Sequence, residues 1–182
     1  MTLDPITTGQ RTFTRRDMAE LLTARTALTE LDLEQALQIA RLMVHRHVPA
    51  GTVLIQEGVT STGYMAMVLQ GEAVVENEIG GPNDSLVLSV LGTGSLFGEM
   101  GVLDGKPRSA TVTAVTDVHI AVLDRSAMVR LVETSPVVAC ALMGALMARL
   151  SERLRQTNAK LRKMTAIQRT LEQEMGARAR AR

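Results

Sequence analysis

Residues 94–112 have the sequence GSLFGEMGVLDGKPRSATV. Within this stretch Glu99 directly follows Gly98 and is surrounded by apolar residues, where a carboxylate needs a polar partner. Gly98 permits a positive φ angle or the close approach of another backbone segment. The first half of the stretch therefore combines a conformationally permissive glycine with a charged group that must be satisfied.

The second half of the stretch has the composition of an anion receptor. Arg108 supplies a planar fork of N–H donors, and the small residues Ser109 and Ala110 leave their backbone N–H groups open to a ligand. Glu99, about ten residues earlier, can accept a hydrogen bond from a sugar hydroxyl. An anion receptor beside a hydroxyl receptor indicates a sugar-phosphate site. The alternative is a Glu99–Arg108 salt bridge that holds the turn.

Glycine recurs throughout the chain from Pro49 to Gly94, and short runs rich in β-forming residues separate the glycines. This pattern predicts an all-β sandwich or barrel. The composition of Gly80–Asp84 is typical of a hairpin tip. The predicted strands are Thr52–Ile55, Tyr64–Leu69, Ala73–Glu78, Leu86–Leu91, Thr111–Val115 and Val118–Leu123.

Helices are expected on both sides of the strands. Thr14 is the expected cap of a short helix through Leu22, and Thr29 the expected cap of a second helix. Apolar residues of the second helix recur at helical spacing: Leu33, Leu37, Ala40 and Val44. After the strands, a short helical segment covers 126–133, and Ser135-Pro136 begins a long helix.

The long helix carries a heptad pattern. Its seam positions alternate in steps of four and three residues: Met143, Met147, Leu150, Leu154, Thr157, Leu161, Met164, Gln168, Leu171 and Met175. This spacing is typical of a coiled coil, and a second copy of the chain is the simplest partner. The alternative is a helix that folds back on its own β domain.

Composition narrows the classes of function. Aromatic residues make up only 2%, which argues against stacking platforms for single-stranded nucleic acid. Residues 1–147 have a net charge of −6 and residues 148–182 of +7, which indicates either a partner rich in negative charge or a solvated helix face. No run of 18 apolar residues is present, so no membrane-spanning helix is expected.

Cysteine and histidine usage predicts neither disulfides nor metal. The single cysteine, Cys140, fits a reducing compartment and hence the cytoplasm, and we expect a small buried residue on a helix. His45 and His47 alternate as on a strand edge, and His119 stands alone in the sequence. Neither arrangement supplies the ligands that zinc needs. No nucleophile–base pair is evident, so we expect no enzyme.

The motifs Phe97-Gly98-Glu99 and Arg108-Ser109-Ala110 resemble the phosphate-binding cassette of cyclic-nucleotide-binding domains. Such domains occur in the catabolite activator protein, in regulatory subunits of cAMP-dependent kinase and in nucleotide-gated channels. The resemblance covers about residues 28–162 and includes three glycine turns: Pro49-Ala50-Gly51, Gln56-Glu57-Gly58 and Gln70-Gly71. It implies a mainly β fold, a jelly-roll-like β-roll with flanking helices and a coiled-coil dimer helix.

The resemblance also implies ligand contacts. Glu99 would bind the ribose 2′-hydroxyl, Arg108 the cyclic phosphate, and the backbone of Gly98, Ser109 and Ala110 would complete the cradle. Ser109 resembles the cAMP-binding members, which favours cAMP over cGMP, with a cyclic dinucleotide as a further option. The remaining predicted ligand-binding residues are Met100, Leu88, Ser89, Thr157 and Asn158.

In the bacterial activators, a polar pair on the dimer helix contacts the base of the nucleotide. The sequence around Thr157 and Asn158 resembles that pair, so both residues are predicted to bind the ligand. The pattern lies about one helical turn beyond the place where the family would put it, and Arg153 occupies that place. Two interpretations stay open here: an extra helical turn, or a chance similarity.

Four segments are predicted: an arm and short helix (1–27), the β-roll domain (28–135), the dimerisation helix (136–176) and a basic tail (177–182). Only about twenty residues follow Met164, too few for the helix-turn-helix of the activators, so no direct sequence-specific DNA binding is expected. The predicted function is a cyclic-nucleotide sensor that acts through an unknown effector protein. The alternatives are a ligand-free dimerisation or docking scaffold, and a DNA-associated regulator without its own helix-turn-helix.

Overall fold

The computed structural model describes residues 12–24, 27–60, 63–81 and 84–180. The described residues up to Ala145 form one compact unit, and those from Leu146 onward form a second. The first unit contains all of the strands, and the second consists of the greater part of one long helix.

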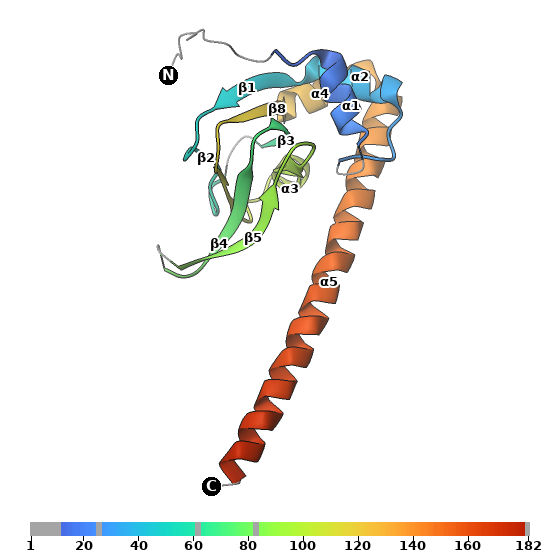
Figure 1. Cartoon of the computed structure of the whole chain (residues 1–182). Coiled ribbons are helices and arrows are strands. Elements are labelled where there is room, and N and C mark those ends of the chain that lie inside the picture. The colour runs from blue at the N-terminus through green and yellow to red at the C-terminus, as the bar shows by residue number, and fades with distance from the viewer. Residues whose placement is uncertain (1–11, 25–26, 61–62, 82–83, 181–182) are drawn as a thin grey trace. The chain divides into compact units, whose positions relative to one another are not determined.

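The first unit contains two antiparallel four-stranded sheets (Figure 1). The first sheet has the order β1 (Val44–Val48), β8 (Val118–Asp124), β3 (Tyr64–Gln70) and β6 (Leu96–Phe97). The second has the order β2 (Val53–Ile55), β7 (Thr111–Ala114), β4 (Ala73–Gly81) and β5 (Asp84–Leu91). The predicted fold class, a β-roll with flanking helices and a long C-terminal helix, is confirmed.

The core lies between the two sheets and is built mainly from aliphatic residues. Its buried members are Ile55, Ala66, Val68, Ala73, Val75, Leu91, Phe97, Val112, Ala114, Val118 and Ile120. β3 is buried on both faces, since Met65 and Met67, which alternate with the core residues of that strand, are also fully buried. Helices α1 (Arg15–Leu22) and α3 (Glu99–Asp104) both contact β3, and they account for this second buried layer.

All six predicted strands are present, with ends that differ by a few residues, and two further strands, β1 and β6, were not predicted. β6 has only two residues, which is too short to show a periodicity. β1 has the sequence VHRHV and forms because it pairs with β8 along its whole length. The central residues of the predicted hairpin tip, 82–83, lie outside the described residues.

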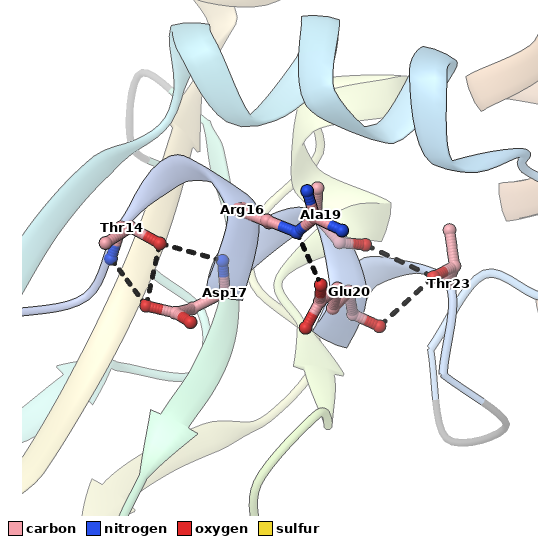
Figure 2. A network of polar contacts seen from close by, with 6 residues as sticks. All are labelled: Thr14, Arg16, Asp17, Ala19, Glu20 and Thr23. Carbon is pink, nitrogen blue, oxygen red and sulfur yellow. Dashed lines mark hydrogen bonds and ion pairs between the residues drawn. The ribbon is translucent and has the colours of Figure 1, made fainter.

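The first helix begins where the sequence predicts. The Thr14 hydroxyl accepts a hydrogen bond from the Asp17 amide at 3.1 Å, and the Asp17 carboxylate accepts one from the Thr14 amide at 2.7 Å (Figure 2). This reciprocal arrangement is a capping box. Figure 2 also shows the Arg16–Glu20 ion pair and Thr23, whose hydroxyl donates to carbonyl oxygens of the last turn. Contacts within the helix thus define both ends of α1.

The second helix, α2 (Leu33–Leu42), differs from the prediction at both ends. Its cap is Asp32 rather than Thr29, because the Asp32 carboxylate and the Gln35 side chain satisfy each other's backbone amides in a second capping box. Val44 was predicted in this helix but begins β1. The buried face of α2 is made by Ala36, Ile39 and Ala40. Figure 1 shows α1 and α2 with α4 (Arg125–Thr134) at one end of the sheets.

The final helix, α5, runs without interruption from Pro136 to Arg180. Cys140 lies on this helix, as predicted, but it is exposed, so the expectation of a buried residue was wrong. The helix buries Val138, Ala139 and Leu142 within the first unit, and Cys140 lies outside that stripe.

In the described residues, no helix is long and apolar enough to cross a membrane.

From Leu154 onward, the apolar residues of the heptad seam of α5 are exposed in the single chain, whereas Met143 and Leu150 are half-buried. Leu154, Leu161 and Met175 are 61%, 62% and 71% exposed, respectively. An apolar stripe of this extent is costly in water, because burial of each such side chain stabilises by roughly 1.5–3 kcal/mol. A coiled-coil dimer through this seam stays a prediction.

Candidate functional site

The predicted binding stretch forms β6, the short helix α3 and the loop that leads to β7. Gly98 separates β6 from α3 and has a φ angle of +77°, in the left-handed region that favours glycine. A Cβ atom at this position would lie 2.7 Å from the Tyr64 carbonyl oxygen and 2.9 Å from Ile55 Cδ1. Glycine is therefore required at position 98 both for its backbone angle and for the space.

Arg108 points inward and is only 7% exposed. Its Nη1 donates to the Gly98 carbonyl oxygen at 2.9 Å and its Nη2 to the Tyr64 carbonyl oxygen at 3.2 Å. The guanidinium carbon also lies 5.0 Å from the centre of the Tyr64 ring. The buried cation is thus held by two neutral oxygens and an aromatic ring.

Two further residues, Gly101 and Tyr64, support Arg108, and neither was predicted as part of the site. A Cβ atom at Gly101 would lie 2.6 Å from Arg108 Nη1, so this glycine makes room for the guanidinium. Tyr64 lies beneath it, and the Tyr64 hydroxyl donates to the Leu54 carbonyl oxygen. Burial raises the pKa of the Tyr64 phenol, and the Arg108 charge partly offsets that increase. A second glycine three residues after Gly98 was a local signal for Gly101, whereas the contact of Tyr64 with Arg108 depends on residues 44 positions apart.

The backbone of Arg108 is attached to the turn after β2. The Arg108 amide donates to the Val59 carbonyl oxygen at 3.1 Å, and the Gly58 amide donates to the Arg108 carbonyl oxygen at 2.9 Å. The glycine turn Gln56–Gly58, noted in the sequence, therefore lies directly against the predicted phosphate-binding residues.

The other predicted residues of the stretch surround this centre. Glu99 is the first residue of α3 and is only 2% exposed. Ser109 is exposed, and its hydroxyl lies 3.8 Å from the sulfur of the exposed Met100. Ala110 is half-buried at the edge of the core. The structure thus brings together Gly98, Glu99, Met100 and the segment 108–110.

Leu88 and Ser89 lie on β5, in the same sheet as β7. Val75 on β4 pairs with Ser89 on one side and with Val112 on the other, so these three residues form one row across the sheet. Two strand spacings, about 9–10 Å, separate the backbones of Ser89 and Val112. Leu88 is 40% exposed and Ser89 is half-buried.

Thr157 and Asn158 lie on α5 within the second unit. Both are exposed, and the Thr157 hydroxyl donates to the Arg153 carbonyl oxygen at 2.9 Å, a bond within the helix. Contact of either residue with a base stays a prediction.

The three histidines lie together in the structure, although His119 is far from the other two in the sequence. β1 pairs with β8 in the register that sets His47 opposite His119. His45 Nε2 lies 2.9 Å from His119 Nδ1, and their rings stack with centroids 5.1 Å apart. Phe13 packs against both rings. In the described part of the chain, no group of His, Cys, Asp or Glu side chains is arranged to hold a metal ion.

Acidification is expected to destabilise the protein through this cluster. Burial lowers the pKa of both His45 and His119 from 6.5, and the neighbouring histidines lower them further, while Asp117 partly opposes the effect at His119. The unfolded chain therefore binds protons at a higher pH than the folded chain, so the free energy of unfolding falls as the pH drops below about 6.5. Urea unfolding at pH 8 and pH 5.5 measures this slope.

A His119→Gln variant should show a smaller loss of stability over the same pH range. Asp124, whose pKa is lowered from 3.8 by hydrogen bonds from Ser126 and Ala127 at the start of α4, acts only at more acid pH and does not confuse the comparison. The His47–Asp117 contact, at 4.0 Å, remains in both proteins. Equal pH slopes in the variant and the parent protein would contradict the prediction.

Comparison with known proteins bears on the same segment. Residues 45–135, half of the chain, match the family model of the cyclic nucleotide-binding domain. The chain belongs to this family. The matched range contains every strand except the first residue of β1, together with α3 and the whole Gly98–Ala110 segment. The family is one of regulatory ligand-binding domains.

Relatives of the domain occur in several contexts. The chain is 35% identical over 121 residues to a cAMP-dependent protein kinase regulatory subunit of Aspergillus fumigatus, covering 65% of this chain and 28% of that protein. It spans about a quarter of the length of the first curated relatives that it matches.

Solved structures show the same fold. A cyclic nucleotide-binding domain from Methylobacillus flagellatus KT superposes with a TM-score of 0.67 at 25% identity, covering 78% of this chain and 79% of that one. The Thermus thermophilus catabolite activator protein superposes with a TM-score of 0.61 at 29% identity, covering 80% of this chain and 63% of that one.

Proposed function

We propose that the chain binds a cyclic nucleotide at the Gly98–Ala110 segment and acts as a regulatory sensor, with cAMP as the preferred ligand. The observation that carries this proposal is the buried guanidinium of Arg108, which donates to the carbonyl oxygen of Gly98. The proposed role is binding and regulation rather than catalysis.

The contacts of Arg108 favour an anionic ligand. In the described residues, the side-chain hydrogen bonds of Arg108 go to two carbonyl oxygens, which are neutral acceptors. A cyclic phosphate shares one negative charge between its two exocyclic oxygens, and a guanidinium can bind such a pair of oxygens in a bidentate manner. The exchange of neutral acceptors for charged ones strengthens the hydrogen bonds and compensates the charge.

The neighbouring residues supply the rest of a sugar-phosphate site. Glu99 lies one residue after Gly98, and its carboxylate can accept a hydrogen bond from the ribose 2′-hydroxyl. The exposed hydroxyl of Ser109 is available as a donor to phosphate. The preference for cAMP over cGMP is proposed for two reasons: Ser109 resembles the cAMP-binding members of the family, and the chain is similar to the regulatory subunit of a cAMP-dependent protein kinase.

The output of the sensor is proposed to pass through α5. The exposed heptad seam is suited to a homodimer, and an effector protein would respond to a change in that dimer. The single cysteine of the chain favours a reducing compartment, which agrees with a proposed cytoplasmic location.

Isothermal titration calorimetry of the purified chain with cAMP, cGMP and cyclic di-GMP tests the proposed function. We expect saturable binding of one molecule per chain, with a lower dissociation constant for cAMP than for cGMP. If cyclic di-GMP binds more tightly than both mononucleotides, the proposed ligand is wrong and the proposed site is retained. If none of the three binds to the folded protein, the sensor function is wrong and the scaffold becomes the better explanation.

A further inference from the structure

Asn77, on β4, connects the sheet to the predicted phosphate-binding segment. Its Nδ2 donates to the Ser109 carbonyl oxygen at 3.1 Å. The last backbone pair between β4 and β7 joins Glu76 to Thr111. Asn77 is the next residue on β4, and Ser109 lies two residues before Thr111. The Asn77 side chain therefore attaches the 108–110 segment to β4 just beyond the last backbone pair.

Glu57 holds the Asn77 amide in this orientation. One Glu57 carboxylate oxygen accepts from Asn77 Nδ2 at 3.4 Å, and the other accepts from the Glu78 amide at 3.2 Å. The Glu57 amide in turn donates to the Thr111 hydroxyl at 3.1 Å. A flipped Asn77 amide would set its oxygen against two oxygen acceptors, so the donor must face Ser109.

The oxygen of the Asn77 side-chain amide makes this orientation unfavourable for stability. Asn77 Oδ1 is buried and has no hydrogen-bond partner in the part of the chain that the structure describes. A buried carbonyl without a partner is destabilising, and such groups are rare. Asn77 is therefore explained by the bonds that its nitrogen donates, and one of those bonds goes to the binding segment.

The direction of the Ser109 carbonyl determines the direction of the next amide. A trans peptide is planar, and its C=O and N–H point to opposite sides. With the Ser109 oxygen held toward β4, the Ala110 N–H points away from β4. In the same way, the Arg108 carbonyl accepts from the Gly58 amide, which sets the direction of the Ser109 N–H.

We propose that Asn77, held by Glu57, is a positioning residue that orients the Ser109–Ala110 backbone toward the anionic phosphate of the ligand. The proposal rests on the cyclic-nucleotide function proposed above. It explains how a loop segment is held ready for an anion before the anion arrives, so that less ordering is required on binding.

The test uses an Asn77→Val variant, which removes the donor and suits a strand, and a Glu78→Gln control at the exposed neighbouring position. The probes are cAMP and its two phosphorothioate diastereomers, in which sulfur replaces one or the other exocyclic phosphate oxygen. We expect Asn77→Val to weaken cAMP binding about tenfold, as for a hydrogen bond that holds a charged ligand's site. The affinity ratio between the two diastereomers should move toward one, and Glu78→Gln should change neither value.

The affinity ratio separates positioning from general damage, because a merely structural loss weakens both diastereomers equally. If Asn77→Val does not fold, Asn77→Ser is used, since its shorter side chain also cannot span the 3.1 Å bond to Ser109. Unchanged affinity and unchanged ratio in a folded variant would overturn the positioning role and leave the nucleotide function intact.

A ligand-free measurement covers the case in which the parent protein binds no nucleotide. Amide hydrogen exchange and the amide NMR signal of Ala110 report on its N–H directly. We expect faster exchange and a shifted signal in Asn77→Val, with Glu78→Gln like the parent protein. An unchanged Ala110 amide would overturn the proposal, whereas a changed amide without nucleotide binding would uphold the positioning and reject the nucleotide as the ligand.

Discussion

Replacement of Arg108 with alanine is expected to weaken cAMP binding by at least about 30-fold. Truncation of one partner in a buried, hydrogen-bonded charge pair costs about 2–5 kcal/mol, and each 1.4 kcal/mol is tenfold in affinity. Arg108 is buried and its guanidinium donates to the Gly98 carbonyl oxygen, so in the variant the ligand phosphate would lose its proposed cationic partner. Calorimetric titration of both proteins measures the difference.

Lys106→Ala provides the matched control. Lys106 is an exposed cation on the same loop, and the hydrogen bond described for it comes from its backbone amide, which donates to Asp104. Its removal changes the net charge as Arg108→Ala does but should leave the affinity within about twofold, because exposed charges interact weakly. Equal losses in the two variants would mean that only the general charge of the loop matters.

A second substitution at the same position distinguishes charge from geometry. Arg108→Lys keeps the positive charge and loses the planar fork of donors. We expect it to bind cAMP more weakly than the parent protein and more tightly than Arg108→Ala. Thermal unfolding without ligand shows whether each variant is folded, which is necessary because Arg108 also holds the Gly98 and Tyr64 carbonyls. Full affinity in folded Arg108→Ala would contradict the proposed site.

Introduction of glutamate at Leu161 is expected to abolish dimerisation. Leu161 is 62% exposed in the single chain and occupies a central seam position of α5. A symmetric dimer would bury two copies of this residue, each contributing roughly 1.5–3 kcal/mol. Their loss alone raises the dimer dissociation constant by about 100-fold or more. Sedimentation equilibrium or light scattering should show a dimeric parent protein and a monomeric variant.

Ala159→Glu introduces the same charge on the same helix, two residues away and therefore on the side opposite the seam. This control should remain dimeric. A monomeric parent protein would show that the prediction of a coiled-coil dimer is wrong. A parent protein and both variants that are equally dimeric would mean that the dimer forms through another surface.

The local part of the candidate site could be predicted from the sequence. Gly98, Glu99 and the segment 108–110 lie within thirteen consecutive residues, and their composition alone indicates an anion receptor. The capping box at Thr14 was equally visible, because the groups that cap a helix lie within three residues of each other. At Thr29 the same argument was wrong. Thr29 and Asp32 are both residue types that cap helices, and Asp32 is the actual cap because it forms a capping box with Gln35.

Six of the eight strands, the glycine turns between them and the heptad pattern could thus be predicted from the sequence, and so could the position of the candidate binding segment. All of these follow from periodicity or from neighbours along the chain. The tertiary structure decided which distant residues meet. Tyr64 reaches Arg108 across 44 positions, and His45 reaches His119 across 74. Asn77 contacts Ser109 across 32. These contacts depend on strand register, which the whole buried core sets, and no local preference of the residues involved specifies it.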